Sequence, residues 1–196
     1  MEIILNLYAG DDLKLKNRKL LFSVYASLLA AIVAVTTMAV SIPTPLGGYV
    51  NIGDGFVLLS GWILGPIWGA LAAGIGSALA DCMGYTIYAP ATFVIKALMA
   101  LIAFALAKCL KPVFKRQTWL AYVLSGIVAE LVMIVGYFVF EAVCLSYGMG
   151  ALANILPNAV QATVGIVIGT LLMSLIDRSR LMEKLMRTKN HKNGKN

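Results

Sequence analysis

The chain has 196 residues, of which 60% are hydrophobic and only 13% charged. Ordinary soluble domains carry about 25% charged residues, so this composition excludes a typical soluble fold. No charged residue occurs between Lys19 and Asp54, between Asp54 and Asp81, or between Glu141 and Asp177. Each interval can hold the roughly 20 apolar residues that cross a bilayer as a helix. The sequence therefore predicts an all-α integral membrane protein.

The net charge of +7 comes from basic residues in three clusters. They precede the first apolar run (Lys14, Lys16, Arg18, Lys19), lie mid-chain (Lys108, Lys111, Lys115, Arg116) and fill the C-terminal tail (Arg178, Arg180, Lys184, Arg187, Lys189, Lys192, Lys195). The positive-inside rule places such clusters in the cytoplasm. The charge thus indicates orientation rather than nucleic-acid binding, and both termini are predicted to be cytoplasmic.

Six transmembrane helices are expected in chain order. They span about residues 20–42, from 51–54 to 64, 67–83, 90–110, 119–144, and from 154 or 157 to 176. The first run is too long for a signal-peptide core of 7–15 residues, so we interpret it as a retained helix. Residues 41–49, with two prolines and a glycine pair, are predicted to form an outer turn. The domains are then a cytoplasmic segment 1–19, a membrane domain 20–178 and a basic cytoplasmic tail 179–196.

The first helix carries small residues at a regular spacing. Ala26, Ala30 and Ala34 recur every four residues and form a flat face that lets another helix approach closely. Packing within the bundle and docking of a separate partner both fit this pattern.

Polar residues gather in the predicted helices at one depth. Ionisable residues inside a membrane are costly and usually functional. The outer half contains Asp54, Asp81, Lys96, Glu141, Asn154, Asn158 and Gln161, while Glu130 lies nearer the middle and Tyr137 shares its helix face. Tyr85 and Tyr88 in the third outer loop are candidates to stack on a flat ligand, or members of an ordinary aromatic belt. Together these residues predict a ligand site open to the outside.

The acids outnumber the bases in this group. Four carboxylates against Lys96 would leave a net charge of −3, which a dry site does not tolerate. Some acids are then protonated or face water, or the ligand supplies donors or positive charge. Lys96 is expected to pair with Asp81, because both lie near the third outer loop. The alternative is a set of bundle salt bridges that bind no ligand.

Signatures of catalysis are missing from the sequence. The three cysteines form no metal-ligand cluster, and the one histidine, His191, lies in the polar tail. No Walker A motif, Gly-x-Ser-x-Gly elbow or His-Glu-x-x-His motif occurs. The sequence predicts no enzyme, no resident cofactor and no metal.

Four short motifs occur together between Gly53 and Lys96. They are G-D-x-x-x-L, L-G-P, G-S-A-L-A-D and A-P-A-T-x-x-x-K. In combination they resemble the substrate-binding S component of energy-coupling factor (ECF) vitamin transporters, in the branch for riboflavin, hydroxymethylpyrimidine or pyridoxine-type substrates. The resemblance covers about residues 20–178.

This resemblance implies a six-helix S-component fold in a prokaryotic plasma membrane. It implies capture of a vitamin from outside and docking on a membrane coupling subunit with two ATPase subunits, which use the ATP. The family's Ala-x-x-x-Ala docking motif maps onto Ala26 and Ala30, extended by Ala34. Family ligands are held by outer loops and helices four to six, which supports Lys96, Glu130, Glu141, Asn154, Asn158 and Gln161.

The acid excess and the tyrosines favour a small, flat, donor-rich or cationic ligand. A pyridoxine-type or hydroxymethylpyrimidine-type vitamin fits better than an anion such as biotin, and riboflavin remains open. The alternative from another class is a structural or assembly subunit of the membrane, whose intramembrane charges form only salt bridges.

Overall fold

Six α-helices and a small hairpin make up the computed structural model, which describes residues 2–179, with side chains from Lys19 onward. The helices are α1 (Glu2–Ala39), α2 (Asp54–Leu64), α3 (Pro66–Asp81), α4 (Ala89–Leu110), α5 (Thr118–Val139) and α6 (Ile155–Arg178). The hairpin joins β1 (Ser41–Pro43) to β2 (Tyr49–Asn51). A π-helical turn, Phe140–Cys144, and a 3-10 turn, Gly148–Asn154, connect α5 to α6. Nearly all of the predicted basic tail lies outside the described residues.

Four stretches of the described chain are long and apolar enough to cross a membrane: Lys19–Ala39, Ala89–Leu110, Thr118–Cys144 and Gly148–Arg178. The helices α2 and α3 have 11 and 16 residues, which at 1.5 Å per residue is about 17 and 24 Å. Both are shorter than the roughly 30 Å hydrocarbon core. The six predicted helices are therefore present, and four of them have the length of a membrane span.

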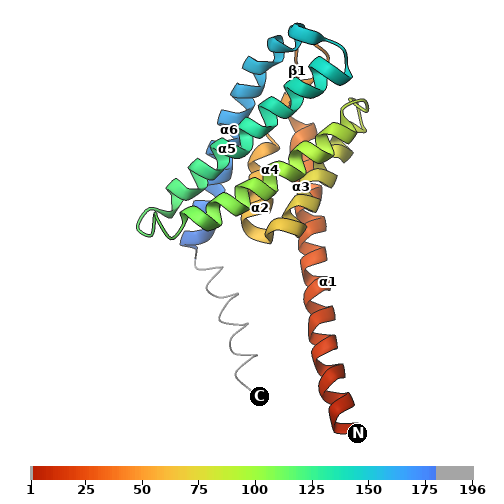
Figure 1. Ribbon diagram of the computed structural model, residues 1–196, viewed down its shortest axis with the longest axis vertical. Helices are drawn as coiled ribbons and strands as arrows, with labels where there is room; N and C mark the ends of the chain where they lie inside the picture. The colour runs from red at the N-terminus through yellow and green to blue at the C-terminus, as the bar shows by residue number, and fades with distance from the viewer. Residues whose placement is uncertain (1, 180–196) are drawn as a thin grey trace.

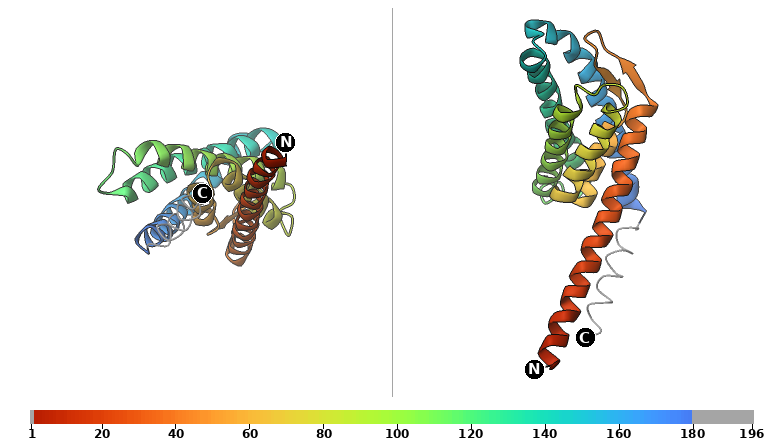
Figure 2. Two further views of the ribbon diagram at one scale, coloured as in Figure 1. Left: turned by 90° about the horizontal axis from the view of Figure 1, so that it is seen from below. Right: turned by 90° about the vertical axis from the view of Figure 1, so that its right-hand side faces the viewer.

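The first helix begins much earlier than predicted. It starts at Glu2 rather than near Leu20, and its 38 residues correspond to about 57 Å. Its N-terminal part extends beyond the ends of the other helices (Figure 2). From Glu2 onward, the predicted cytoplasmic segment is thus part of the same helix as the first apolar run.

The short helix α2 lies at the centre of the bundle and packs against α1, α3, α4 and α6. Its residues Val57, Leu58 and Trp62 belong to the main hydrophobic core. Gly61 lets α4 come close, since a Cβ there would lie 2.3 Å from the carbonyl oxygen of Ala100. Close packing through small residues is the usual way in which helices associate in a membrane.

A second close contact joins α1 to α3. A Cβ at Gly76 would lie 2.4 Å from the carbonyl oxygen of Ala30. Ala26 and Ala30 form a small apolar cluster with Leu64 and Ala72. The alanine face of α1 therefore packs within the chain.

The predicted outer turn contains a two-stranded antiparallel hairpin in which Ser41 pairs with Asn51 and Pro43 with Tyr49. The hairpin lies at the end of the bundle that also carries the α3–α4 and α5–α6 connections (Figure 1). The N-terminus and the basic α4–α5 connection lie at the opposite end. This arrangement separates the hairpin from the basic residues 108–116, as the charge pattern predicts.

Candidate ligand-binding site

A polar cavity lies beneath the hairpin. Its lining residues come from the hairpin and from α1, α3, α4, α5, α6 and the connections between them: Thr37, Thr44, Gly48, Tyr49, Asn51, Ser77, Asp81, Tyr88, Thr92, Lys96, Tyr137, Glu141, Asn154, Asn158 and Gln161. The cavity volume is about 30 Å³, enough for about two water molecules. Pockets that hold small ligands measure about 300–1,000 Å³. The cavity is therefore smaller than such a pocket, and a small ligand would require it to widen.

Most of the predicted site residues line this cavity. They are Asp81, Tyr88, Lys96, Tyr137, Glu141, Asn154, Asn158 and Gln161. Asp54, Tyr85 and Glu130 do not line it. Seven lining residues are not among the predicted site residues, namely Thr37, Thr44, Gly48, Tyr49, Asn51, Ser77 and Thr92. Five of them come from the end of α1 and the hairpin, where only an outer turn was expected.

Lys96 pairs with Asp54, so the expected pairing with Asp81 is wrong. The Lys96 Nζ donates to Asp54 Oδ1, and the two side chains are 3% and 1% exposed. Asp54 is the first residue of the central helix α2, which packs directly on α4. Proximity along the loop suggested Asp81, but the packing of α2 against α4 determines the partner.

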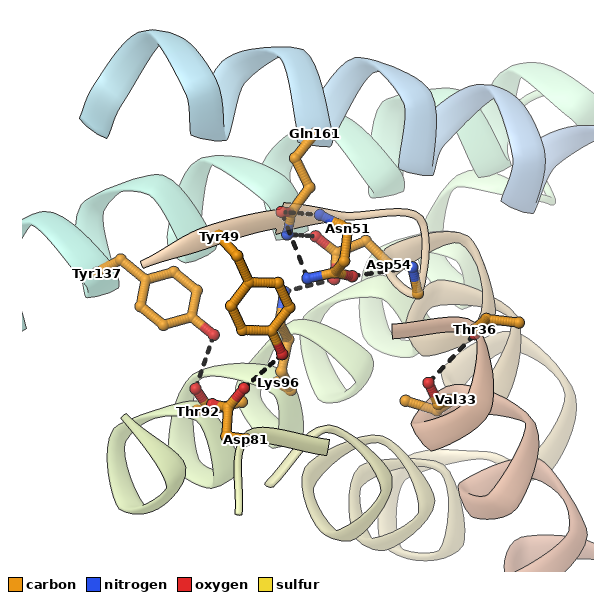
Figure 3. A network of polar contacts seen from close by, with 11 residues as sticks. Val33, Thr36, Tyr49, Asn51, Asp54, Asp81, Thr92, Lys96, Tyr137 and Gln161 are labelled. Atoms are coloured by element: carbon orange, nitrogen blue, oxygen red, sulfur yellow. Dashed lines mark hydrogen bonds and ion pairs between the residues drawn. The ribbon is translucent and has the colours of Figure 1, made fainter. Parts of the chain in front are cut away.

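Gln161 connects this ion pair to the hairpin. Its Nε2 donates to Asp54 Oδ2 at 2.5 Å, and its Oε1 accepts from the backbone N–H of Asn51 at 2.8 Å. The Asn51 side chain in turn accepts from the backbone N–H of Gly53 at 2.9 Å. Figure 3 shows Gln161 reaching from α6 to both Asn51 and Asp54. The position of β2 is thus coupled to the charged centre of the bundle.

Tyr49 makes the second contact between the hairpin and the bundle. Its hydroxyl donates to Asp81 Oδ1 at 2.5 Å, and its ring stacks on Tyr85 with centroids 4.3 Å apart. Burial, and then the neighbouring Asp81 carboxylate, raise the pKa of Tyr49 well above its usual value. Tyr85 therefore contacts the hairpin through Tyr49 and does not line the cavity.

Two further tyrosines form an aromatic wall of the cavity. Tyr88 and Tyr137 lie with ring centroids 6.5 Å apart. The Tyr137 hydroxyl shares a 2.9 Å hydrogen bond with Thr92, and the Lys96 Nζ lies 5.5 Å from its ring centroid. Burial and the nearby Glu141 raise the pKa of Tyr88. The wall offers flat apolar surface beside hydrogen-bonding groups.

Glu141 and Asn154 lie where α5 and α6 connect. Asn154 Nδ2 donates to Glu141 Oε1 at 2.8 Å, and the Tyr88 hydroxyl contacts the same oxygen at 3.4 Å. Glu141 Oε2 and Asn154 Oδ1 are buried and have no hydrogen-bond partner. Two acceptor atoms are therefore left over at this end of the cavity.

Glu130 lies outside the cavity, in the interior of the bundle. Its side chain is 1% exposed, and neither carboxyl oxygen has a hydrogen-bond partner. A Cβ at Gly165 would lie 2.7 Å from Glu130 Oε1 and 2.8 Å from the Asp54 Cβ. The glycine in α6 therefore makes room for Glu130 beside Asp54.

The alanines predicted to dock a partner are mostly covered by the chain itself. Ala26, Ala30 and Ala34 are 7%, 9% and 8% exposed. Beside them, α1 and α3 enclose an apolar groove of about 410 Å³ with Ala26 and Ala30 among its lining residues. Ser27 and Ala31 also line it, and both are exposed. Docking at this face remains a prediction.

Fold and site together define a membrane-embedded protein with a small polar cavity at one end. Residues 18–178 match the family model described as "ECF-type riboflavin transporter, S component", and the chain belongs to that family. Its members are substrate-binding components of transporters, and this protein is accordingly a transporter component and not an enzyme.

Two individual similarities accompany the family match. The structure superposes on a chain from "Structure and mechanism of the S component of a bacterial ECF transporter" with a TM-score of 0.65 and 25% identity, covering 85% of this chain and 99% of the other. An "uncharacterized protein in gap 3′ region" of Pyrococcus woesei is 38% identical over 138 residues, which is 70% of this chain and 88% of that protein.

Proposed function

We propose that this protein captures a vitamin from outside a prokaryotic cell, with riboflavin as the leading candidate, and delivers it through an ECF coupling subunit and two ATPases. The observation that carries the proposal is the cavity, in which polar side chains from five helices and the hairpin meet at one level beneath the hairpin. The family description names riboflavin, which supports it as the candidate ligand. The protein holds the ligand, and its partners supply the energy.

The hairpin is the cover of the site. Its bonds to the bundle are Tyr49 to Asp81 and Asn51 to Gln161. Opening breaks both and widens the cavity between the hairpin and α4–α6. Once a ligand is in place, the same bonds reform over it and exclude water. Both hairpin partners inside the bundle, Asp81 and Gln161, also line the cavity, so ligand contacts and closure are linked.

The electrostatics of the cavity favour a ligand without negative charge. Lys96 is neutralised by Asp54, and Asp81 accepts a bond from Tyr49, so no cation is left for an anionic ligand among the described lining residues. The tyrosine wall suits a flat ring. Riboflavin, pyridoxine and hydroxymethylpyrimidine combine a flat ring with hydroxyl groups, and the riboflavin named in the family description supports it as the leading candidate.

Native mass spectrometry of the detergent-purified protein, followed by titration with these three vitamins, tests the proposal. We expect saturable binding of one of them and its loss in Lys96→Met, measured at a temperature at which thermal unfolding shows this destabilised variant to be folded. Lys108→Met is the matched control, because Lys108 lies on the same helix but is exposed and outside the cavity. Failure of all three vitamins to bind would favour the structural or assembly subunit instead.

A further inference from the structure

The two unpartnered acceptors at the α5–α6 end of the cavity point to a specific recognition element. Glu141 and Asn154 are each 2% exposed. Both hydrogen bonds that the Glu141 side chain receives fall on Oε1, so Oε2 has no donor, and Asn154 Oδ1 also has none. A buried acceptor without a donor costs about 1–3 kcal/mol, and a ligand donor bound there would remove that cost.

The local backbone directs both side chains to this place. Glu141 lies in the π-helical turn Phe140–Cys144, and such turns are rare and frequent at functional sites. Asn154 immediately precedes α6, where asparagine usually caps the helix. It makes no capping bond here and instead donates to Glu141. Two residues thus give up ordinary helical roles to face the cavity.

Glu141 differs from Glu130 because it accepts hydrogen bonds from Asn154 and Tyr88, and such bonds favour an ionised carboxylate. Among the described residues no lysine or arginine forms an ion pair with it, and the one lysine in the cavity lining is paired with Asp54. Tyr88 and Asn154 supply neutral donors only. A ligand group placed here therefore meets two free acceptors, one of which belongs to a carboxylate.

We propose that Glu141 and Asn154 form a subsite for the hydroxyl-bearing end of the ligand, and that Glu141 rejects the phosphate ester of the same molecule. This rests on the proposed function and deepens it to a substrate class: free alcohols rather than phosphorylated vitamins. Hydroxyl groups donate to Glu141 Oε2 and Asn154 Oδ1. A phosphate ester replaces that donor by a group of charge about −1.5 to −2, which the carboxylate repels in a medium of low dielectric constant.

The test measures the dissociation constants of riboflavin and riboflavin 5′-phosphate for the full-length protein in detergent, with pyridoxine and hydroxymethylpyrimidine and their phosphate esters in parallel. The preference is the dissociation constant of the ester divided by that of the alcohol. In the wild-type protein we expect the alcohol to bind more tightly. Glu141→Gln keeps the shape of the side chain and removes its charge. It should weaken alcohol binding about tenfold, since bonds to charged groups are stronger, and should lower the preference by a similar factor.

Two further variants separate this explanation from others. Asn154→Asp adds a second negative charge at the same place and should raise the preference for the alcohol, so a lowered or unchanged preference contradicts the subsite. Asp81→Asn removes an acid from the α3 side of the cavity and should lower the preference much less than Glu141→Gln does. An effect of Asp81→Asn as large as that of Glu141→Gln would mean that the overall charge of the cavity rejects phosphate, which also overturns the proposal.

The outcomes distinguish this inference from the proposed function. Tight binding of an alcohol with a preference that Glu141→Gln does not alter refutes the subsite and leaves vitamin capture standing. Absence of binding by every alcohol and every ester refutes vitamin capture, and the subsite with it.

Discussion

Lys96 Nζ donates to Asp54 Oδ1 in the interior of the bundle, where the two side chains are 3% and 1% exposed. Gln161 donates to the other Asp54 oxygen, so the carboxylate is bonded on both sides. A buried pair with these additional bonds repays much of its desolvation. Removing either Lys96 or Asp54 leaves the other side chain as an unpaired charge in an apolar environment.

Lys96→Met should therefore destabilise the protein by about 3–5 kcal/mol, the usual effect of breaking a buried ion pair. Thermal unfolding in detergent measures the change. Replacing both partners, as Asp54→Leu with Lys96→Met, should recover much of the stability because no isolated charge remains. A double variant less stable than Lys96→Met would show that the pair stabilises the fold beyond mutual neutralisation.

Helix positions followed closely from the sequence because charge-free runs end at glycine and proline. The start of α3 at Pro66 and of α4 at Ala89 agree with the predicted starts within one residue. The apolar span of α1 begins at Lys19, close to the predicted Leu20, but the helix itself begins at Glu2, which was missed because the basic residues before Leu20 were interpreted as a separate cytoplasmic segment. The basic residues indicate where the apolar span ends, but the helix α1 extends beyond that span.

The sequence predicted which residues lie at the level of the site, but it did not predict which of them bond to one another. Eight of the proposed residues line the cavity because polar side chains at one level of a bundle converge. The partner of Lys96 depends on how α2 rotates against α4, which no spacing within either helix specifies. Asn51 was missed because a three-residue strand has too short a pattern to recognise, and its role depends on contact with Gln161, 110 residues later.

Tyr49→Phe should speed the release of the vitamin. It removes the hydroxyl that donates to Asp81 and keeps the ring that stacks on Tyr85. Bonds to charged groups contribute about 1.5–3 kcal/mol, so the dissociation rate should rise about tenfold or more in stopped-flow fluorescence. Tyr85→Phe is the control, since it preserves the stacked ring and no hydrogen bond of the Tyr85 hydroxyl occurs among the described residues. We call the Tyr49–Asp81 hydrogen bond the latch, because it would hold the hairpin closed over the ligand. An equal effect of both variants on the dissociation rate would argue against this role.

This latch should be insensitive to pH over a wide range. Burial and the Asp81 carboxylate raise the pKa of Tyr49, and only its protonated hydroxyl donates. A raised pKa means that the contribution is fully present below the ordinary tyrosine value of about 10 and is lost only as the pH rises through the higher value in the folded protein. The ratio of the Tyr49→Phe and wild-type dissociation rates should stay constant between pH 7 and about 10. A decline of the ratio within that window would contradict it.

Glu130 should tolerate neutralisation. An ionised carboxylate with neither a hydrogen bond nor a partner in the bundle interior would cost several kcal/mol, so the side chain is expected to be an uncharged acid. Glu130→Gln has nearly the same shape and should unfold at about the wild-type temperature, with loss of the infrared carbonyl band of a protonated carboxyl group. Asp54→Asn is the contrasting variant, because it strands Lys96 and should lower the unfolding temperature clearly. A similar loss in both would show that Glu130 is ionised and paired.

Docking on the coupling subunit should depend on the exposed side of α1 more than on its buried alanines. Ala31 is exposed and lines the apolar groove between α1 and α3, whereas Ala30 is 9% exposed and its backbone meets Gly76. Ala31→Trp should fill the groove and abolish vitamin uptake in cells that contain the coupling subunit and ATPases. Vitamin affinity and the unfolding temperature of the purified protein should be unchanged.

Ala30→Trp should behave differently, because overpacking a close helix contact typically costs about 1–3 kcal/mol. It should lower the unfolding temperature of the isolated protein, and any loss of uptake then includes a loss of fold. Measuring uptake, vitamin affinity and thermal unfolding for both variants separates the two effects. If Ala31→Trp leaves uptake intact, the groove is not the docking surface, and another exposed face of the bundle must contact the coupling subunit.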